Sequence, residues 1–248
     1  MASTTSTTLS PAAQEYLESI YWLYEAGIER SPTNLSRALQ VSPPSVSEML
    51  RKLQAEGLVT RTPDKRVSLT DRGEQVAKHV VSRHRLIEAF LVKVMGLRWD
   101  DVHEEAEAFE MGVTPQLEAR MLELIGGIKT CPHGHPIGDY PREAGVPLTA
   151  VSTGSVVRVL RFENEDHKLL QTFYAQGVEP RSKYVITAHD DAATTLTPES
   201  GGKPGTLPSY MARTISVAVE RQGDGAPAEQ DPTSLATAYL LGESHWSR

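Results

Sequence analysis

The sequence has only one cysteine, Cys131, among its 248 residues. A single thiol cannot form an internal disulfide bond, which is typical of proteins in a reducing compartment. The chain also lacks any apolar run approaching the roughly 20 residues of a membrane-spanning helix. Its first residues, MASTTSTTLS, are polar and lack the apolar core of a signal peptide. These absences predict a cytoplasmic protein with no membrane partner.

Motifs of common enzymes are absent as well. The chain contains no P-loop, no Gly-x-Ser-x-Gly and no His-Glu-x-x-His, the signatures of several large enzyme classes. We therefore expect a protein that is not an enzyme. A metallohydrolase or a metal carrier is the alternative from another class, because acidic residues gather in one segment described below.

Positive charge is scarce, since 25 Lys and Arg are outnumbered by 32 Asp and Glu, for a net charge of −7. That balance by itself argues against a nucleic-acid partner. The charge is uneven, however: residues 30–75 carry eight basic and five acidic side chains, and are net positive. The length suggests two or three modules, so we interpret this segment as a basic module attached to an acidic body.

The basic module contains a strong helix signal. Ser42 is a good N-cap, Pro43 suits the first helical position, and Gly57 is typical of a helix end. Apolar residues recur at helical spacing in between. They are Val46, Met49, Leu50 and Leu53.

The order of elements around this helix is typical of a winged helix-turn-helix. Helices are predicted over residues 11–26 and 32–39, before it, and residues 58–70 are predicted to form two strands around a tight turn. This order predicts that the third helix enters the major groove of DNA and that the hairpin is the wing. The alternative is a small helical domain whose basic face is only solvated.

One short recognition helix contacts few base pairs, so we expect a homodimer on a palindrome with half-sites about 10 base pairs, or a multiple, apart. Side chains at the helix start should face bases, and basic side chains should hold phosphates. The candidate DNA contacts are Ser42, Pro44, Ser45 and Ser47 at the helix start, then Arg51, Lys52, Lys65 and Arg66.

The stretch 103–112, HEEAEAFEMG, places unusual residues on one helical stripe. His103, Glu107, Glu110 and Met111 lie at i, i+4, i+7 and i+8, where an ordinary amphipathic helix has Leu and Val. These side chains carry atoms that bind cations. A solvated acidic face is an equally good interpretation of the stripe alone.

The remaining chain continues with a long helix over about 71–95, which carries His84 and Glu88 at i, i+4, and a helix over 115–125. Residues 129–141, KTCPHGHPIGDYP, resemble a metal-ligand cluster, but their Pro and Gly favour a linker turn. The segments 154–162, 183–188 and 214–220 have strand patterns. They predict a small β-barrel.

Taken together, these segments resemble the diphtheria-toxin-repressor (DtxR) family of metal-dependent repressors, including its manganese-responsive branch. The resemblance covers residues 12 to about 220 and depends on EYLESIYWL, VSPPSVSEMLRKLQAEGLV, LTDRGEQVAKHVVSRHRLIEAFL, VHEEAEAFE and CPHGHPIG. It implies a mainly α protein with a β-rich C-terminal domain. The expected parts are a winged helix-turn-helix domain (1–76), a helical dimerisation and metal-binding domain (77–146), an SH3-like small barrel (147–222) and a tail (223–248).

The resemblance also implies metal ligands by position. A primary set falls on Glu15, Glu18, Glu107 and Glu110, an ancillary set on His84, Glu88 and His103, and ligands from the SH3-like domain on Asp166 and His167. Iron-responsive members have Cys in place of Glu107, and many members have His in place of Met111. Met111 is therefore either a weak ligand or a core residue, and we favour packing.

Carboxylate oxygens with imidazoles suit Mn²⁺ or Fe²⁺ better than zinc or copper(I). We therefore expect a regulator of metal homeostasis genes that Mn²⁺ activates, with Fe²⁺ as the competitor. The alternative is a winged-helix regulator that responds to a non-metal signal and keeps a structural metal site.

Overall fold

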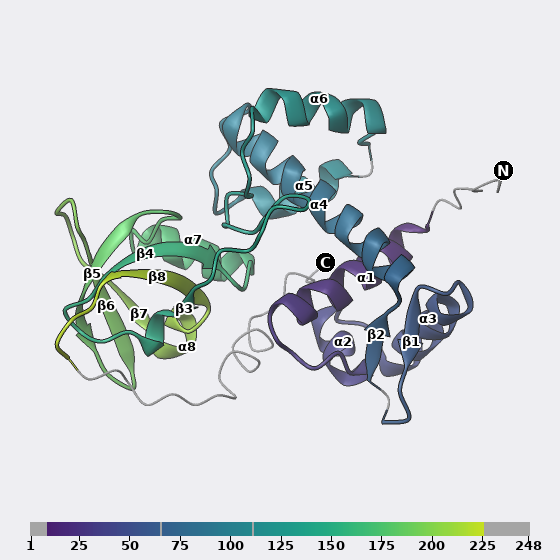
Figure 1. The fold of residues 1–248 in the computed structure, drawn as a ribbon, viewed down its shortest axis with the longest axis horizontal. Helices are drawn as coiled ribbons and strands as arrows, with labels where there is room; N and C mark the ends of the chain where they lie inside the picture. Colours follow the sequence, from purple (N-terminus) through teal and green to yellow (C-terminus); the bar gives the residue numbers. More distant parts are fainter. Residues whose placement is uncertain (1–8, 65, 111, 226–248) are drawn as a thin grey trace. The chain divides into compact units, whose positions relative to one another are not determined.

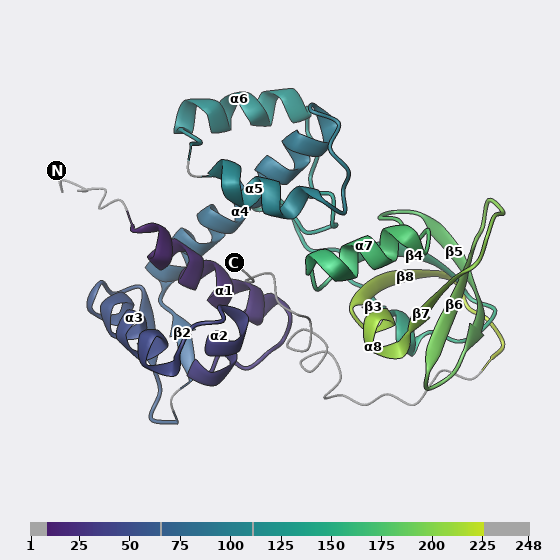
Figure 2. The ribbon, with the colours of Figure 1, turned by 180° about the vertical axis from the view of Figure 1, so that it is seen from behind.

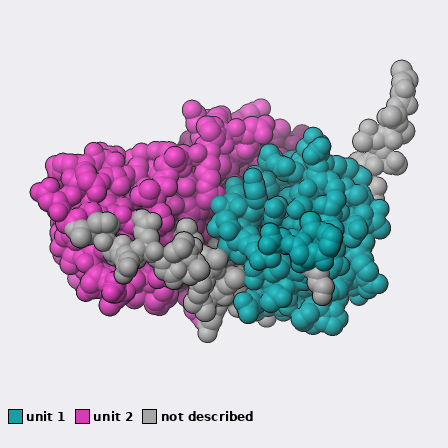
Figure 3. Space-filling view, turned by 60° about the horizontal axis from the view of Figure 1, so that its bottom comes forward, with its two compact units in different colours: residues 1–81, 248 teal, residues 82–247 magenta. Residues whose placement is uncertain are grey.

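The computed structural model describes residues 9–64, 66–110 and 112–225, and these divide into two compact units. The first unit ends at Val81 and the second begins at Ser82, as coloured in Figure 3. The boundary lies inside the long helix α4 (Asp71–Lys93).

The first unit is a winged helix-turn-helix, as predicted (Figure 1). It contains α1 (Pro11–Glu25), α2 (Pro32–Ala38), α3 (Pro43–Ala55) and the antiparallel strands β1 (Val59–Arg61) and β2 (Val67–Leu69). Each of the three helices begins with a serine whose hydroxyl accepts a backbone N–H, followed by proline in the first turn. The helix starts are therefore determined locally.

The polar face of α3 stays exposed because three of its aliphatic residues face the core on the opposite side. Val46, Leu50 and Leu53 are fully buried, whereas Arg51 and Lys52 are exposed. Gly73, near the start of α4, lies so close to the chain before β1 that an added Cβ would be 1.8 Å from the Leu58 carbonyl oxygen. Only glycine, which has no Cβ, allows the start of α4 to come this close to the chain before β1.

The helical part of the second unit contains the end of α4, α5 (Val102–Glu110) and α6 (Pro115–Ile125). Leu86, Ile87, Val102, Met121 and Ile125 form its core. Among the described residues, no helix is both long and apolar enough to cross a membrane.

The β-rich part of the second unit is one six-stranded antiparallel sheet with the order β3-β8-β4-β5-β6-β7 (Figure 2). The strands are β3 (Val146–Pro147), β4 (Val156–Phe162), β5 (Lys183–His189), β6 (Ala193–Pro198), β7 (Gly205–Pro208) and β8 (Ile215–Arg221). A 3-10 turn (Leu148–Ala150), α7 (His167–Ala175) and α8 (Ser209–Ala212) complete it. The predicted fold class, mainly α with a β-rich C-terminal domain, is confirmed.

The apolar face of α7 packs on this sheet through Leu169, Leu170 and Phe173. Trp99, which precedes α5, joins the same core and stacks on Phe162 with ring centroids 5.2 Å apart. Within the second unit, Trp99 therefore forms an apolar contact between the helical part and the sheet. The loop between α6 and β3 lies beside it, because Phe162 donates its N–H to the His133 carbonyl.

Candidate metal centre

Four buried side chains of the second unit converge between its helical part and its sheet. His84 and Glu88 lie one turn apart on α4, His103 is in the first turn of α5, and Glu165 precedes α7. Their candidate ligand atoms lie within 4.8 Å of one another. Two imidazoles and two carboxylates at this spacing can hold a divalent cation.

A second group shares Glu88 with this cluster. Cys131 and His133, from the loop between α6 and β3, are buried and also place their ligand atoms within 4.8 Å of Glu88. We call the six residues His84, Glu88, His103, Cys131, His133 and Glu165 the buried cluster.

Glu88 lies at the centre of the buried cluster. Its Oε1 is 3.2 Å from His84 Nε2, 2.9 Å from His103 Nδ1 and 3.2 Å from His133 Nδ1. Glu165 Oε2 is 3.3 Å from the same two Nδ1 atoms of His103 and His133. Carboxylate oxygens and ring nitrogens thus face one small volume.

His133 has the orientation expected of a metal ligand. Its Nε2 is 2.7 Å from the carbonyl oxygen of Trp99, and a carbonyl only accepts, so Nε2 carries a proton and donates it. Nδ1 then faces Glu88 and Glu165. Metal-binding histidines commonly donate their other ring N–H to a backbone carbonyl in this way.

The pKa values of the cluster show how strongly its charges interact. Burial alone would raise the pKa of Glu88, but the imidazoles of His133 and His84 lower it well below its usual value. Burial lowers the pKa of His84, but Glu88 and Glu110 raise it to about 10. In the metal-free protein, protons on imidazoles therefore balance the buried carboxylates.

The residues fit a divalent cation. Glu88 is fully buried, and its Oε2 has no hydrogen-bond partner among the described residues. An ionised oxygen without a partner is costly in a protein interior, and a metal ion removes that cost. The donor set mixes hard carboxylates and imidazoles with the softer Cys131 sulfur. Burial and Glu88 raise the pKa of Cys131 to about 11 in the absence of a cation.

The predicted primary-set residues of α5 lie on the other side of the two imidazoles. His103 Nε2 is 3.6 Å from Glu107 Oε1, and His84 Nδ1 is 3.9 Å from Glu110 Oε2. Glu110 also pairs with Arg83, whose Nε is 3.2 Å from Oε1. Glu104 and Glu105 are exposed, as expected for residues off the stripe.

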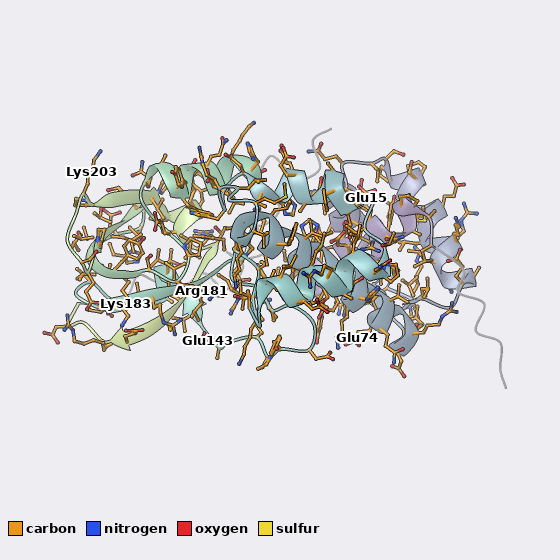
Figure 4. All side chains as sticks on the ribbon, turned by 90° about the horizontal axis from the view of Figure 1, so that it is seen from above. Glu15, Glu74, Glu143, Arg181, Lys183 and Lys203 are labelled. Atoms are coloured by element: carbon orange, nitrogen blue, oxygen red, sulfur yellow. The ribbon has the colours of Figure 1, made fainter. Side chains whose placement is uncertain are left out.

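The structure places the other two residues of the predicted primary set on α1. Glu15, labelled in Figure 4, and the buried Glu18 lie on α1, in the first unit. Met111 lies outside the described residues. The ligand roles of Glu15 and Glu18, and the packing role of Met111, remain predictions.

The two residues predicted as ligands from the SH3-like domain, Asp166 and His167, are not among the residues of the buried cluster. Asp166 is the N-cap of α7, and its Oδ1 accepts the N–H groups of Lys168 and Leu169 at 3.0 and 3.2 Å. His167 is partly exposed and faces Glu104, with 3.9 Å between Nδ1 and Oε1. Neither enters the buried cluster, because the chain turns into α7 at Asp166. Glu165, one residue earlier, is the one that does.

Cys131 and His133 belong to the buried cluster, although the sequence pattern around them favours a linker turn. The turn exists, since Gly134 has φ +97° and Thr130 pairs with Pro136. The turn also presents buried side chains. The Cys-Pro-His spacing is the sequence signal for these two candidate ligands. The sequence does not show that Arg85 Nη1 and Ser82 Oγ form hydrogen bonds that bind this loop to α4.

The predicted DNA contacts lie on an exposed surface of the first unit. Ser42, Pro44, Ser45, Arg51, Lys52 and Arg66 are exposed, and Ser47 is partly buried. Arg66 pairs with Asp64 at 2.9 Å. Lys65 lies outside the described residues.

Two family models match the chain. The model for the iron dependent repressor N-terminal DNA binding domain matches residues 8–67, and the model for the iron dependent repressor metal binding and dimerisation domain matches residues 70–139. The iron-dependent repressor IdeR of Mycobacterium tuberculosis is 30% identical over 226 residues, covering 84% of this chain and 97% of that protein.

Solved structures agree with the sequence matches. A manganese-dependent transcriptional repressor in complex with manganese superposes with a TM-score of 0.76 at 34% identity, covering 84% of this chain and 99% of that one. The manganese regulator SloR superposes with a TM-score of 0.70 at 28% identity, covering 86% of this chain and 100% of that one.

Proposed function

We propose that this chain binds palindromic operator DNA as a homodimer when Mn²⁺ is bound. The chain belongs to the iron-dependent (diphtheria-toxin) repressor family, and it is thus a metal-dependent transcriptional repressor and not an enzyme. It would thereby control genes of metal homeostasis, with Fe²⁺ as the competing ion. Residues 1–76 would bind DNA, 77–146 would dimerise and bind metal, and 147–222 would form the SH3-like domain, followed by the tail 223–248.

The buried cluster is the observation that carries this proposal. Glu88 and Glu165 are buried carboxylates whose charge needs a cation, and three imidazoles surround them. A divalent ion bound there supplies two positive charges in place of protons. We therefore include Cys131, His133 and Glu165 with His84, Glu88 and His103 in this ligand set, and exclude Asp166 and His167.

The carboxylates of the predicted primary set favour manganese. Glu107 is a hard oxygen donor where a soft thiolate would favour other ions, and Glu110, Glu15 and Glu18 add oxygens. Cys131 in the buried cluster favours softer ions, which is why Fe²⁺ remains the competitor. We assign Met111 to packing.

An in-vitro selection from random duplex DNA in the presence of Mn²⁺ tests the proposal. The selected sequences should be palindromes with half-sites about 10 base pairs, or a multiple, apart. Their affinity should then be titrated against free Mn²⁺ and free Fe²⁺ under anaerobic conditions. Equal affinity with and without metal would favour the alternative, a winged-helix regulator of a non-metal signal.

Glu110→Ala and Glu104→Ala are matched variants for this titration, because both replace a glutamate of α5. Glu110→Ala should abolish activation by every divalent ion, whereas Glu104 is exposed and off the stripe, so its variant should keep the wild-type response. A Glu110→Ala protein that still responds to Mn²⁺ would remove Glu110 from the ligand set.

A further inference from the structure

His135 lies beside the buried cluster but is bonded differently from its neighbour His133. The side chain is buried, and its Nε2 is 2.9 Å from the carbonyl oxygen of Phe162 and 3.1 Å from Glu165 Oε1. Both contacts therefore use the same ring nitrogen.

Hydrogen-bond chemistry determines what that nitrogen can do. A carbonyl oxygen only accepts, so Nε2 of His135 must carry a proton and donate it. A protonated ring nitrogen has no lone pair for a metal ion, and among the described residues His135 belongs to neither group of candidate ligands, whereas His133 offers its Nδ1 to one of them. In His133 the proton points away from the cluster, toward Trp99, whereas in His135 it points toward Phe162 and Glu165.

The two carboxylate oxygens of Glu165 consequently have different partners. Oε1 faces His135, and Oε2 lies 3.3 Å from Nδ1 of both His103 and His133. Glu165 lies in an irregular segment between β4 and α7. The side chain therefore projects from a segment outside the regular helices and strands, and its Oε1 is 3.1 Å from His135 Nε2.

The backbone holds His135 in a defined place. The Cys131 N–H donates to the His135 carbonyl at 2.8 Å, and the Phe162 N–H donates to the His133 carbonyl at 3.0 Å. A Cβ added at Gly134 would be only 1.9 Å from the Leu160 carbonyl oxygen. The turn that carries His135 is thus bound directly to β4, the strand that leads to Glu165.

We propose that His135 is a positioning residue for the metal centre: it holds Glu165 Oε1 so that Oε2 is directed at the metal, and it is not itself a ligand. The inference rests on the proposed function, because it assumes that a metal ion binds at the buried cluster. Outer partners of this kind typically contribute about 10- to 100-fold to metal affinity.

A double-mutant cycle on the full chain tests this role, with Co²⁺ as the probe and its absorption spectrum as a readout of coordination. His135→Leu should weaken Co²⁺ binding by about 10- to 100-fold and alter the spectrum. In a Glu165→Ala background, the same change should alter affinity by less than about threefold, because the two residues act as one unit. His135→Gln, whose amide can still donate, should recover part of the affinity.

His189→Leu is the matched control, since the ring of His189 bonds Thr194 and the Thr149 carbonyl instead of a cluster residue. It should leave the Co²⁺ affinity and spectrum unchanged. Thermal unfolding of each metal-free variant checks folding, and His135→Asn replaces His135→Leu in the cycle if the leucine variant does not fold.

Equal losses from His135→Leu in both backgrounds would overturn the inference, because His135 would then act independently of Glu165. A Glu165→Ala protein with unchanged affinity and spectrum would also overturn it. Failure of the proposed function looks different: the wild-type chain itself would not bind Co²⁺, and both ideas would be withdrawn.

Discussion

Helix α3 and the buried cluster are constructed in opposite ways. The exposed polar face of α3 comes from a single stretch of 13 residues, whose ends are determined by a serine cap and a glycine. The cluster takes six side chains from α4, α5, the loop after α6 and the segment before α7, and all of them are buried or nearly so. The exposed face of α3 thus depends on neighbouring residues in the sequence, whereas the buried cluster depends on contacts between distant segments.

This difference predicts how substitutions behave. Exposed side chains on one helix act almost independently and are screened by water and salt. Buried charges depend on one another, because removal of one leaves its partners uncompensated. Effects should therefore be largest in the buried cluster and decline toward α3.

Glu88→Gln should have the largest effect. Glu88 faces three imidazoles, so its loss should reduce Mn²⁺ affinity by more than about 100-fold, the upper end for outer partners of a metal site. Isothermal titration calorimetry measures this change. Glu105→Gln, an exposed glutamate on α5, should bind like the wild type. Equal Mn²⁺ affinity in the two variants would show that the buried cluster is not the metal centre.

Gly134→Ala should lower the free energy of unfolding by at least about 2 kcal/mol, from overpacking together with left-handed strain. The new Cβ would be 1.9 Å from the Leu160 carbonyl oxygen, and φ is +97°. Gly127→Ala is the control: its φ is +79°, but nothing lies within 4 Å of the added Cβ, so only the backbone strain remains. Urea unfolding of the metal-free proteins compares them. Equal losses would mean that the contact with β4 is unimportant.

Ser42→Ala should destabilise the chain by about 1 kcal/mol, because the Ser42 hydroxyl accepts the Ser45 N–H at the start of α3. Ser42→Asp keeps a good cap but adds a negative charge. It should restore stability in urea unfolding while weakening DNA binding at low salt. If Ser42→Asp binds DNA as tightly as the wild type, the start of α3 does not approach DNA.

Arg51→Ala should have the smallest effect on the folded protein, since Arg51 is exposed and its Nε makes a long hydrogen bond to the Ser47 carbonyl at 3.4 Å. It should weaken all DNA sequences alike and reduce the slope of log affinity against log salt by about 0.9 per lost phosphate contact. Fluorescence anisotropy at several salt concentrations measures the slope, with Arg120→Ala on α6 as the control. A changed base preference with an unchanged slope would contradict a phosphate contact.

Local sequence signals were sufficient for the parts of the molecule whose structure is determined locally. Ser42, Pro43 and Gly57 predict the bounds of α3 to within a residue or two, because capping acts over one helical turn. His84 and Glu88 were paired correctly on one face of α4, since i, i+4 geometry needs only the helix. Threonine-rich β6 and short β7 escaped prediction, because their place in the sheet depends on pairing with β5 and with each other.

The sequence by itself determined that a basic winged helix precedes an acidic body with cation-binding side chains, because charge and helical periodicity are properties of short segments. Only the tertiary structure decided which side chains meet. Glu165 enters the buried cluster and Asp166 does not, since capping of α7 uses the Asp166 carboxylate. Cys131 and His133 enter it because hydrogen bonds from Arg85 and Phe162 hold their loop in place. Such contacts join residues far apart in the chain, and no local pattern encodes them.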